Sequence, residues 1–169
     1  MVSVTFQVNL VENNDLVEIT EEEISADREG HRPRLNAPDV LNGALWIRAA
    51  GQPPIEVVDE LWQLTQVLCF ACVCTLTADP PAAFLYRYMS AGAELTLTPD
   101  GPRLHIAGSD IPSATVEAAE LLPALHQCGQ RFLDLLLDLG PPAAEVHAYL
   151  APFGERSAAG LKARALDPG

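Results

Sequence analysis

The chain has 169 residues, and its 23 aspartates and glutamates outnumber 10 lysines and arginines, which gives a formal net charge of -13. A charge of this sign opposes binding to nucleic acid phosphates and to anionic lipid, so we expect neither nucleic acid nor a membrane among its partners. The length suits one domain, which we place over residues 1–154, with a loosely held C-terminal tail over 155–169. The chain begins without a basic and apolar leader, which favours the cytoplasm.

The N-terminal part has the alternating pattern of half-buried strands. Apolar and polar residues alternate over 2–10, and Asn13-Asn14-Asp15 supplies turn residues before a second predicted strand at 16–20. Residues 21–38 mix charges, glycine and proline without a period, so we predict a loop there. The segment ALWIRA at 44–49 predicts a third strand.

The most apolar stretch runs from Pro53 to Thr77 and predicts a long central helix. Its apolar residues recur at spacings of four and three, as at Val57, Leu61, Leu64, Leu68 and Ala71. An uncharged run of 18 residues from 61 to 78 reaches only the lower limit of a membrane span and has no flanking lysine or arginine. A buried core helix is therefore favoured over a membrane helix.

The segment that follows predicts further strands. Residues 82–89 alternate, and ELTLTPDGPRLHIA at 94–107 has apolar alternation on both sides of a turn that we place at 98–101. The side chains expected to face the core in this hairpin are Leu95, Leu97, Leu104 and Ile106.

Two further helices complete the predicted fold. Residues 115–139 keep the four-three spacing, and Pro123 either kinks this helix or lies in the first turn of one that starts near Leu122. Pro141-Pro142 can open a short helix through Leu150. We therefore predict an α+β domain with a largely antiparallel sheet of about six strands and two long helices packed on one face.

The two halves of the chain show a possible internal repeat. LWI at 45–47 and LHI at 104–106 are each followed by a proline and a valine at the same spacing, with a common offset of 59 residues. This offset indicates a possible pseudo-repeat of three strands and a helix, βββα.

The cysteines and histidines were considered as metal ligands. The candidates are Cys69, Cys72, Cys74, His126 and Cys128. Cys72 and Cys74 are two residues apart, as are His126 and Cys128, so neither pair shares a helical face and each offers zinc at most one ligand. No lysine or arginine lies between Arg48 and Arg87 to activate a thiol. We interpret the cysteines as buried structural thiols and expect no metal and no cofactor.

The sequence contains no recognisable catalytic signature. There is no Gly-x-Ser-x-Gly elbow, Walker loop, dinucleotide fingerprint or His-Glu-x-x-His motif. We therefore expect a protein that is not an enzyme, with an enzyme of unrecognised type as the alternative.

Acidic residues concentrate in the first 30 positions. Eight carboxylates and one arginine, Arg28, give this segment a net charge of −7, which would steer a basic protein partner. The partner-binding candidates are Asp15, Glu18, Glu21, Glu22, Glu23, Asp27 and Glu29, with Tyr86 and Tyr88 as aromatic anchors. The alternatives are a solvated acidic face and tyrosines packed under the helices. As exposed charges, these carboxylates should contribute little to stability.

Together, the acidic charge, modest size, sheet-and-helix pattern and absence of catalytic motifs resemble small acidic α+β immunity proteins, which bacteria use to neutralise a cognate toxin. The resemblance implies a non-enzymatic cytoplasmic inhibitor that binds a basic toxin or effector. Residues 94–139, a hairpin followed by a long helix, are also similar to acidic secretion chaperones. Those proteins usually begin with a helix, whereas this chain begins with a strand.

Overall fold

The computed structural model describes residues 1–36, 40–89 and 93–166, and within them the strands form two antiparallel sheets of four strands each. The strand orders are β2-β1-β3-β4 and β5-β6-β7-β8. The strands are β1 (Val2–Glu12), β2 (Asp15–Thr20), β3 (Asn42–Ala49), β4 (Ile55–Glu60), β5 (Phe84–Arg87), β6 (Glu94–Asp100), β7 (Arg103–Gly108) and β8 (Ala114–Glu117). The α+β class is as predicted, but two sheets replace the single sheet of about six strands.

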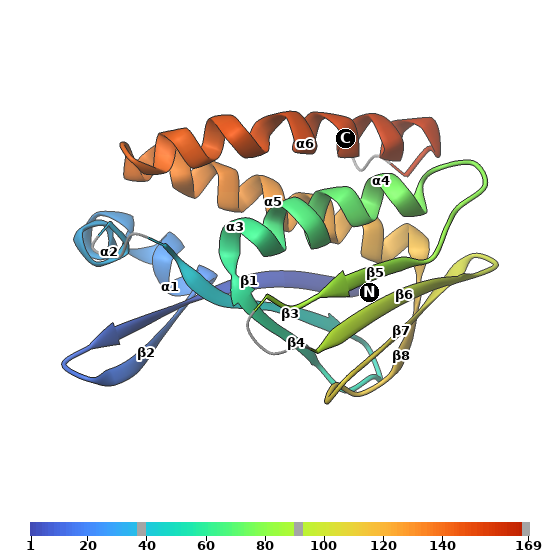
Figure 1. The fold of residues 1–169 in the computed structure, drawn as a ribbon, viewed down its shortest axis with the longest axis horizontal. Coiled ribbons are helices and arrows are strands. Elements are labelled where there is room, and N and C mark those ends of the chain that lie inside the picture. The colour runs from blue at the N-terminus through green and yellow to red at the C-terminus, as the bar shows by residue number, and fades with distance from the viewer. Residues whose placement is uncertain (37–39, 90–92, 167–169) are drawn as a thin grey trace.

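The helices gather on one side of the sheets (Figure 1). They are α1 (Glu21–Ala26), α2 (Arg28–Leu35), α3 (Leu61–Gln63), the π-helix η1 (Leu64–Ala71), α4 (Cys72–Leu76), α5 (Ala118–Leu139) and α6 (Ala143–Ala163). The segments α3, η1 and α4 follow one another as a continuous rod, and α5 packs against this rod and against β1. The last helix, α6, lies on α5 and η1 and so adds a further layer above the two predicted long helices.

The predicted central helix is wrong at its start, because residues 55–60 form the strand β4. Ile55, Val57 and Asp59 are buried while the residues between them are more exposed, which is the period of two of a strand. Val57 and Leu61 are nevertheless four positions apart, so they also fit a helical stripe. The apolar pattern therefore runs across the junction without a visible break.

The second sheet repeats this strand-to-helix junction. Leu45 pairs with Val57 across β3 and β4, and Leu104 pairs with Val116 across β7 and β8. Each residue of the second pair lies 59 positions after its counterpart, so the two sheets share a register at this junction. The helix predicted from residue 115 accordingly begins at Ala118, after β8. The outer strands differ, because β2 follows β1 in the chain whereas β5 precedes β6.

The predicted hairpin at 94–107 is present, with its turn two residues later than expected. The four side chains predicted to face the core, Leu95, Leu97, Leu104 and Ile106, are all buried. Asp100 pairs with Arg103, which leaves Gly101 and Pro102 as the turn. Gly101 has a φ of 61°, a left-handed conformation that glycine adopts at little cost. The turn therefore forms at Gly101.

The segment predicted to be a loop contains two short helices. The hydroxyl of Thr20 accepts a hydrogen bond from the backbone N–H of Glu23, whose carboxylate accepts one from the Thr20 N–H, so this capping box starts α1. Asp27 caps α2 by accepting a hydrogen bond from the N–H of Gly30 at 3.0 Å. Residues 37 and 38 of the predicted loop lie outside the described residues.

Residues 155–163 of the predicted C-terminal tail form the second half of α6, and residues 167–169 of that tail lie outside the described residues. This helix continues from Ala143 to Ala163, well past the predicted end at Leu150, with Pro152 inside it. Ser157 and Leu161 are buried where α6 packs on α4, α5 and η1. The segment is rich in alanine and has few large apolar residues, so packing against the other helices supports it more than its own sequence pattern does.

Candidate functional site

The hairpin of β1 and β2 extends away from the rest of the molecule (Figure 1). Asn13 and Asn14 have φ values of 53° and 70°, so both turn residues are left-handed, as a two-residue hairpin turn requires. Asparagine tolerates this conformation better than most residues, which explains why the sequence places the turn here.

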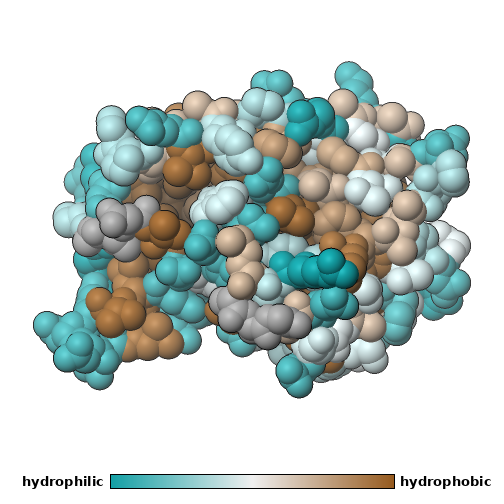
Figure 2. Space-filling model, in the orientation of Figure 1, coloured by the Kyte–Doolittle hydropathy of each residue, from teal (hydrophilic) through white to brown (hydrophobic). Residues whose placement is uncertain are grey.

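The tip of this hairpin carries an exposed apolar pair. Val11 and Leu16 face each other across the two strands, with 76% and 62% of their surface exposed. Figure 2 shows the hairpin as an apolar patch with a hydrophilic tip, at the lower left. Neither residue was predicted to belong to a binding surface, although Leu10-Val11 and Leu16-Val17 break the alternation on both sides of the turn. Two consecutive apolar residues in a strand must point one side chain to each face.

Four of the predicted partner-binding carboxylates surround this end without internal partners. Asp15 and Glu18 lie on β2, Glu22 on α1 and Glu29 on α2, and all four are exposed. Within the described residues, no ion pair or hydrogen bond to these side chains is present. Their charges are therefore free to face solvent or a partner.

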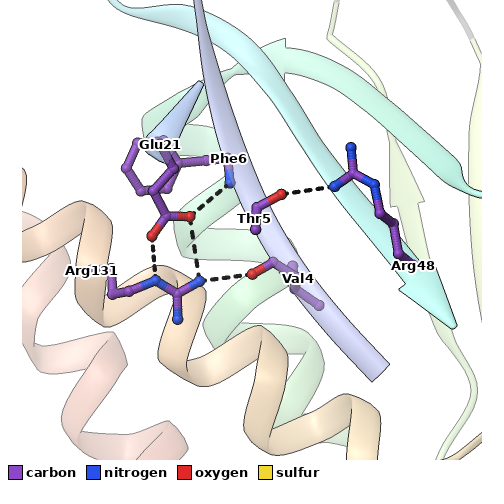
Figure 3. Close-up of polar contacts among 6 residues, drawn as sticks. All are labelled: Val4, Thr5, Phe6, Glu21, Arg48 and Arg131. Atoms are coloured by element: carbon purple, nitrogen blue, oxygen red, sulfur yellow. Dashed lines mark hydrogen bonds and ion pairs between the residues drawn. The ribbon is translucent and has the colours of Figure 1, made fainter. Parts of the chain in front are cut away.

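The side chain of Glu21, by contrast, binds other residues of the protein. Its carboxylate pairs with Arg131 of α5 and accepts a hydrogen bond from the backbone N–H of Phe6 at 3.2 Å. The same Arg131 donates to the carbonyl oxygen of Val4 at 2.7 Å. Figure 3 shows both side chains lying along the edge of β1. Only 13% of the Glu21 side chain is exposed, so its role here is to join α1, β1 and α5.

Glu21→Gln is expected to lower the free energy of unfolding by about 1–3 kcal/mol, because it weakens charge-assisted bonds to Arg131 in a largely buried position. Glu22→Gln is the matched control and should change it by less than about 0.5 kcal/mol, since Glu22 is exposed and unpaired. Urea unfolding of the two variants measures the difference. Equal unfolding midpoints would show that the bridge to Arg131 does not contribute. The expectation that all these acidic residues matter little for stability is thus revised for Glu21.

Two more of the predicted carboxylates act as helix caps. Glu23 and Asp27 hold the first turns of α1 and α2. The hydrogen bonds from the backbone and hydroxyl of Thr20 lower the pKa of Glu23, so this carboxylate keeps its charge to lower pH than usual. Neither residue is as free to contact a partner as Asp15 or Glu18.

The two candidate tyrosines lie in the core between the sheets. Tyr86 is buried, and its hydroxyl donates to the carboxylate of Asp59 on β4 at 2.7 Å, while the backbone N–H of Met89 donates to the same oxygen at 2.9 Å. Tyr88 is partly buried with its ring against that of Tyr86, at 5.4 Å between centroids. Burial and the Asp59 hydrogen bond raise the pKa of Tyr86. Tyr86 therefore links the two sheets and is not presented on the surface.

Two adjoining cavities lie on this side of the molecule, and the second of them borders the hairpin. The first, of about 480 Å³, is a mostly apolar groove between α2, α3, α5 and α6, lined by residues that include Leu35, Trp62, Phe132 and Tyr149, and Glu145 is the one carboxylate among the described lining residues. Its volume is within the range of known binding pockets. The second, of about 550 Å³, lies between the hairpin and α2. Val40 lines both, so the two cavities adjoin. A hollow is visible above the hairpin in Figure 2.

Polar contacts hold α2 between these cavities. Arg34 pairs with Glu12 of the hairpin at 2.7 Å and lowers the pKa of that carboxyl, and Arg28 pairs with Asp138 of α5. The side-chain amide of Asn36 donates to the carbonyl oxygen of Leu139 at 3.0 Å. Arg28 and Arg34 thus bind the protein's own carboxylates, Arg32 donates to the backbone carbonyl oxygen of Asp138, and the net charge left on this end is acidic.

The cysteines and histidines do not form a ligand set in the described part of the chain. No group of three or more His, Cys, Asp or Glu side chains there is placed to hold a metal ion. Cys69, Cys72 and Cys128 are buried, and Cys74 is partly buried. Burial raises the pKa of Cys72 and Cys74, which opposes formation of a thiolate nucleophile. Among the described residues, no helix combines the length and apolar character needed to cross a membrane.

Comparison of the chain with protein-family models, with curated proteins and with solved structures finds no match in any of the three. The surface features of the hairpin end are therefore the basis for inferring a function.

Proposed function

We propose that the chain is a non-enzymatic cytoplasmic protein that binds and neutralises a basic toxin or effector protein, in the manner of an immunity protein. The observation that carries the proposal is the exposed pair of Val11 and Leu16, which lies among unpaired carboxylates on a projecting hairpin. Apolar residues supply most of the affinity of an interface, and a charged rim supplies steering and specificity. The hairpin end combines both.

The adjoining cavities extend this surface. A partner that contacts the hairpin at Val11 can also place apolar side chains in the cavity beside it, because Val11 itself lines that cavity. From there, Val40 leads into the groove that contains Trp62 and Tyr149. A polypeptide fits this arrangement better than a small molecule, because the two cavities lie on either side of α2 and a small ligand would fill only one.

The same surface would also suit an acidic secretion chaperone, which is the alternative function. Such a chaperone would bind a basic segment of an effector protein. The identity of the partner decides between the two: an inhibitor should abolish the activity of its partner, whereas a chaperone should leave it intact after release. Genes that neighbour this one are the first place to find the partner.

The apolar pair is tested by Val11→Ser and Leu16→Ser, measured against the partner by surface-based binding kinetics. Each substitution should weaken binding by about 1 kcal/mol or more, which is about fivefold or more in Kd. Folding should change little, because both side chains are already largely exposed. If both variants bind as tightly as the wild type, the hairpin is not the interface and the proposal fails.

The acidic rim is tested by the double variant Asp15→Asn, Glu18→Gln in the same measurement. Its association rate should fall severalfold at low salt, and the difference should shrink as salt screens the rim charges. The matched control is Asp100→Asn, Glu117→Gln, which removes the same charge from exposed positions near the β6–β7 turn, at the opposite end of the molecule (Figure 1). Equal association rates for the two double variants would mean that only net charge matters.

A further inference from the structure

The outer edge of β2 carries unpaired backbone groups. β2 is an edge strand of the first sheet, and its turn pairs Glu12 with Asp15. In a two-residue hairpin the residues that flank the turn form a hydrogen-bonded pair, and pairs alternate from there. The N–H and C=O groups of Val17 therefore point to β1, whereas those of Leu16 and Glu18 point outward.

The neighbouring edge of β1 shows how the molecule covers such groups elsewhere. Beyond the end of β2, the N–H of Phe6 donates to the carboxylate of Glu21, and the C=O of Val4 accepts from Arg131. Figure 3 shows these two side chains occupying the place that a further strand would take. The exposed edge of β1 is therefore closed by side chains.

The outer edge of β2 is closed only at its end. The N–H of Thr20, the next outward-pointing group, donates to the carboxylate of Glu23 at 2.8 Å. In the part of the chain that the structure describes, no hydrogen bond reaches the outward groups of Leu16 and Glu18. β2 also contains no lysine, proline or bulge, since its six residues pair one to one with β1. These are among the features that usually block an edge strand, and the charges that β2 does carry, on Asp15 and Glu18, repel an acidic strand but not a basic one.

We propose that the outer edge of β2 binds its partner by strand addition, pairing through Leu16 and Glu18 with an extended basic segment of the partner protein. This inference rests on the proposed function and adds the binding mode. The main-chain hydrogen bonds would align the segment, and Leu16 would contact its apolar side chains. Asp15 and Glu18 select a basic strand, because opposite charges on adjacent strands attract. A second copy of the chain is disfavoured, since its own acidic β2 would face these carboxylates.

The test uses a synthetic eight-residue peptide of alternating lysine and valine, with amide hydrogen exchange measured by NMR. In the free protein, the amides of Leu16 and Glu18 should exchange fast and that of Val17 slowly. A saturating amount of peptide should slow exchange at Leu16 and Glu18 by about tenfold or more, because protection reports newly formed hydrogen bonds. The control peptide has the same side chains with every backbone nitrogen methylated, so it keeps the charge but both of its edges are blocked, and it should give no protection.

Variants of β2 provide a second measurement. Leu16→Pro removes the outward N–H and is compatible with an edge strand, whereas Leu16→Ala keeps the N–H and removes most of the side chain. The proline variant should lose the peptide-induced protection at Glu18, and the alanine variant should retain it. Slow exchange at Val17 in both variants shows that the hairpin is folded.

The remaining outcomes overturn the proposal in distinguishable ways. Peptide binding that shifts the resonances of Val11 and Asp15 without protecting Leu16 and Glu18 rejects strand addition but leaves the hairpin as the interface. An absence of peptide binding also rejects strand addition, and the kinetics of the Val11 and Leu16 serine variants then decide the proposed function separately. Dimerisation that Leu16→Pro abolishes would assign this edge to a second copy of the chain.

Discussion

Leu68→Ala is expected to lower the free energy of unfolding by about 2–5 kcal/mol. Leu68 lies in η1 and has no exposed surface, and η1 packs against both α5 and α6. Removing its side chain leaves a cavity that neighbouring helices cannot easily fill. The adjacent Phe70 ring already occupies the space left by two glycines: an added Cβ at Gly129 would lie 2.6 Å from the ring, and one at Gly154 would lie 3.3 Å from it. Little freedom remains for repacking.

The matched control is Leu137→Ala on α5, where the leucine is 54% exposed. Both variants make the same chemical change within a helix, so the difference between them reports burial alone. The control should lose less than about 0.5 kcal/mol. Urea unfolding monitored by circular dichroism gives both values. Similar losses for the two variants would show that η1 is not part of the core.

Strands bounded by turns were predictable from the alternation of apolar and polar residues. Strands that run directly into a helix were not. β1 and the β6–β7 hairpin are bounded by turn residues, so their period of two is visible in isolation. β4 and β8 end directly against α3 and α5, and the inward-facing residues of strand and helix form one continuous stripe. Asp59 shows the consequence: it falls within the predicted central helix, but it lies on β4 as a buried carboxylate that accepts a hydrogen bond from Tyr86.

The candidate site was predictable as a region but not residue by residue. The density of charge in the first 30 residues identified the hairpin end, and Asp15 and Glu18 do lie free on its surface. Glu21 differs only through its contact with Arg131, which is 110 residues away in the chain. The residues around Glu21 in the sequence do not indicate such a long-range contact. The groove was equally hidden, because four separate helices supply its walls.

The buried thiols should make the protein sensitive to alkaline pH. The pKa of Cys72 is raised by burial, and that of Cys128 is raised by a hydrogen bond with Cys69 and by burial. In the unfolded chain a thiol has a pKa of about 8.5. Below that pH both states hold the protons and the stability is fully present. Above it the unfolded chain releases protons that the folded protein retains, so stability falls as pH rises.

Each such thiol removes about 1.4 kcal/mol of stability per pH unit between its unfolded and its folded pKa, so Cys72 alone predicts a loss of about 2 kcal/mol between pH 7 and pH 10, and Cys128 adds to this loss. Urea unfolding at pH 7, 8.5 and 10, with a reductant present throughout, measures the loss. The variant Cys72→Ala, Cys128→Ala should be less stable at pH 7 because of the lost packing, yet its stability should fall much less on going to pH 10. The comparison separates the two effects, since packing sets the value at pH 7 and thiol ionisation sets the slope. If the variant and the wild type lose the same stability between pH 7 and pH 10, the buried thiols are not the source of the alkaline sensitivity, and Tyr86, whose pKa is also raised, becomes the group to replace next.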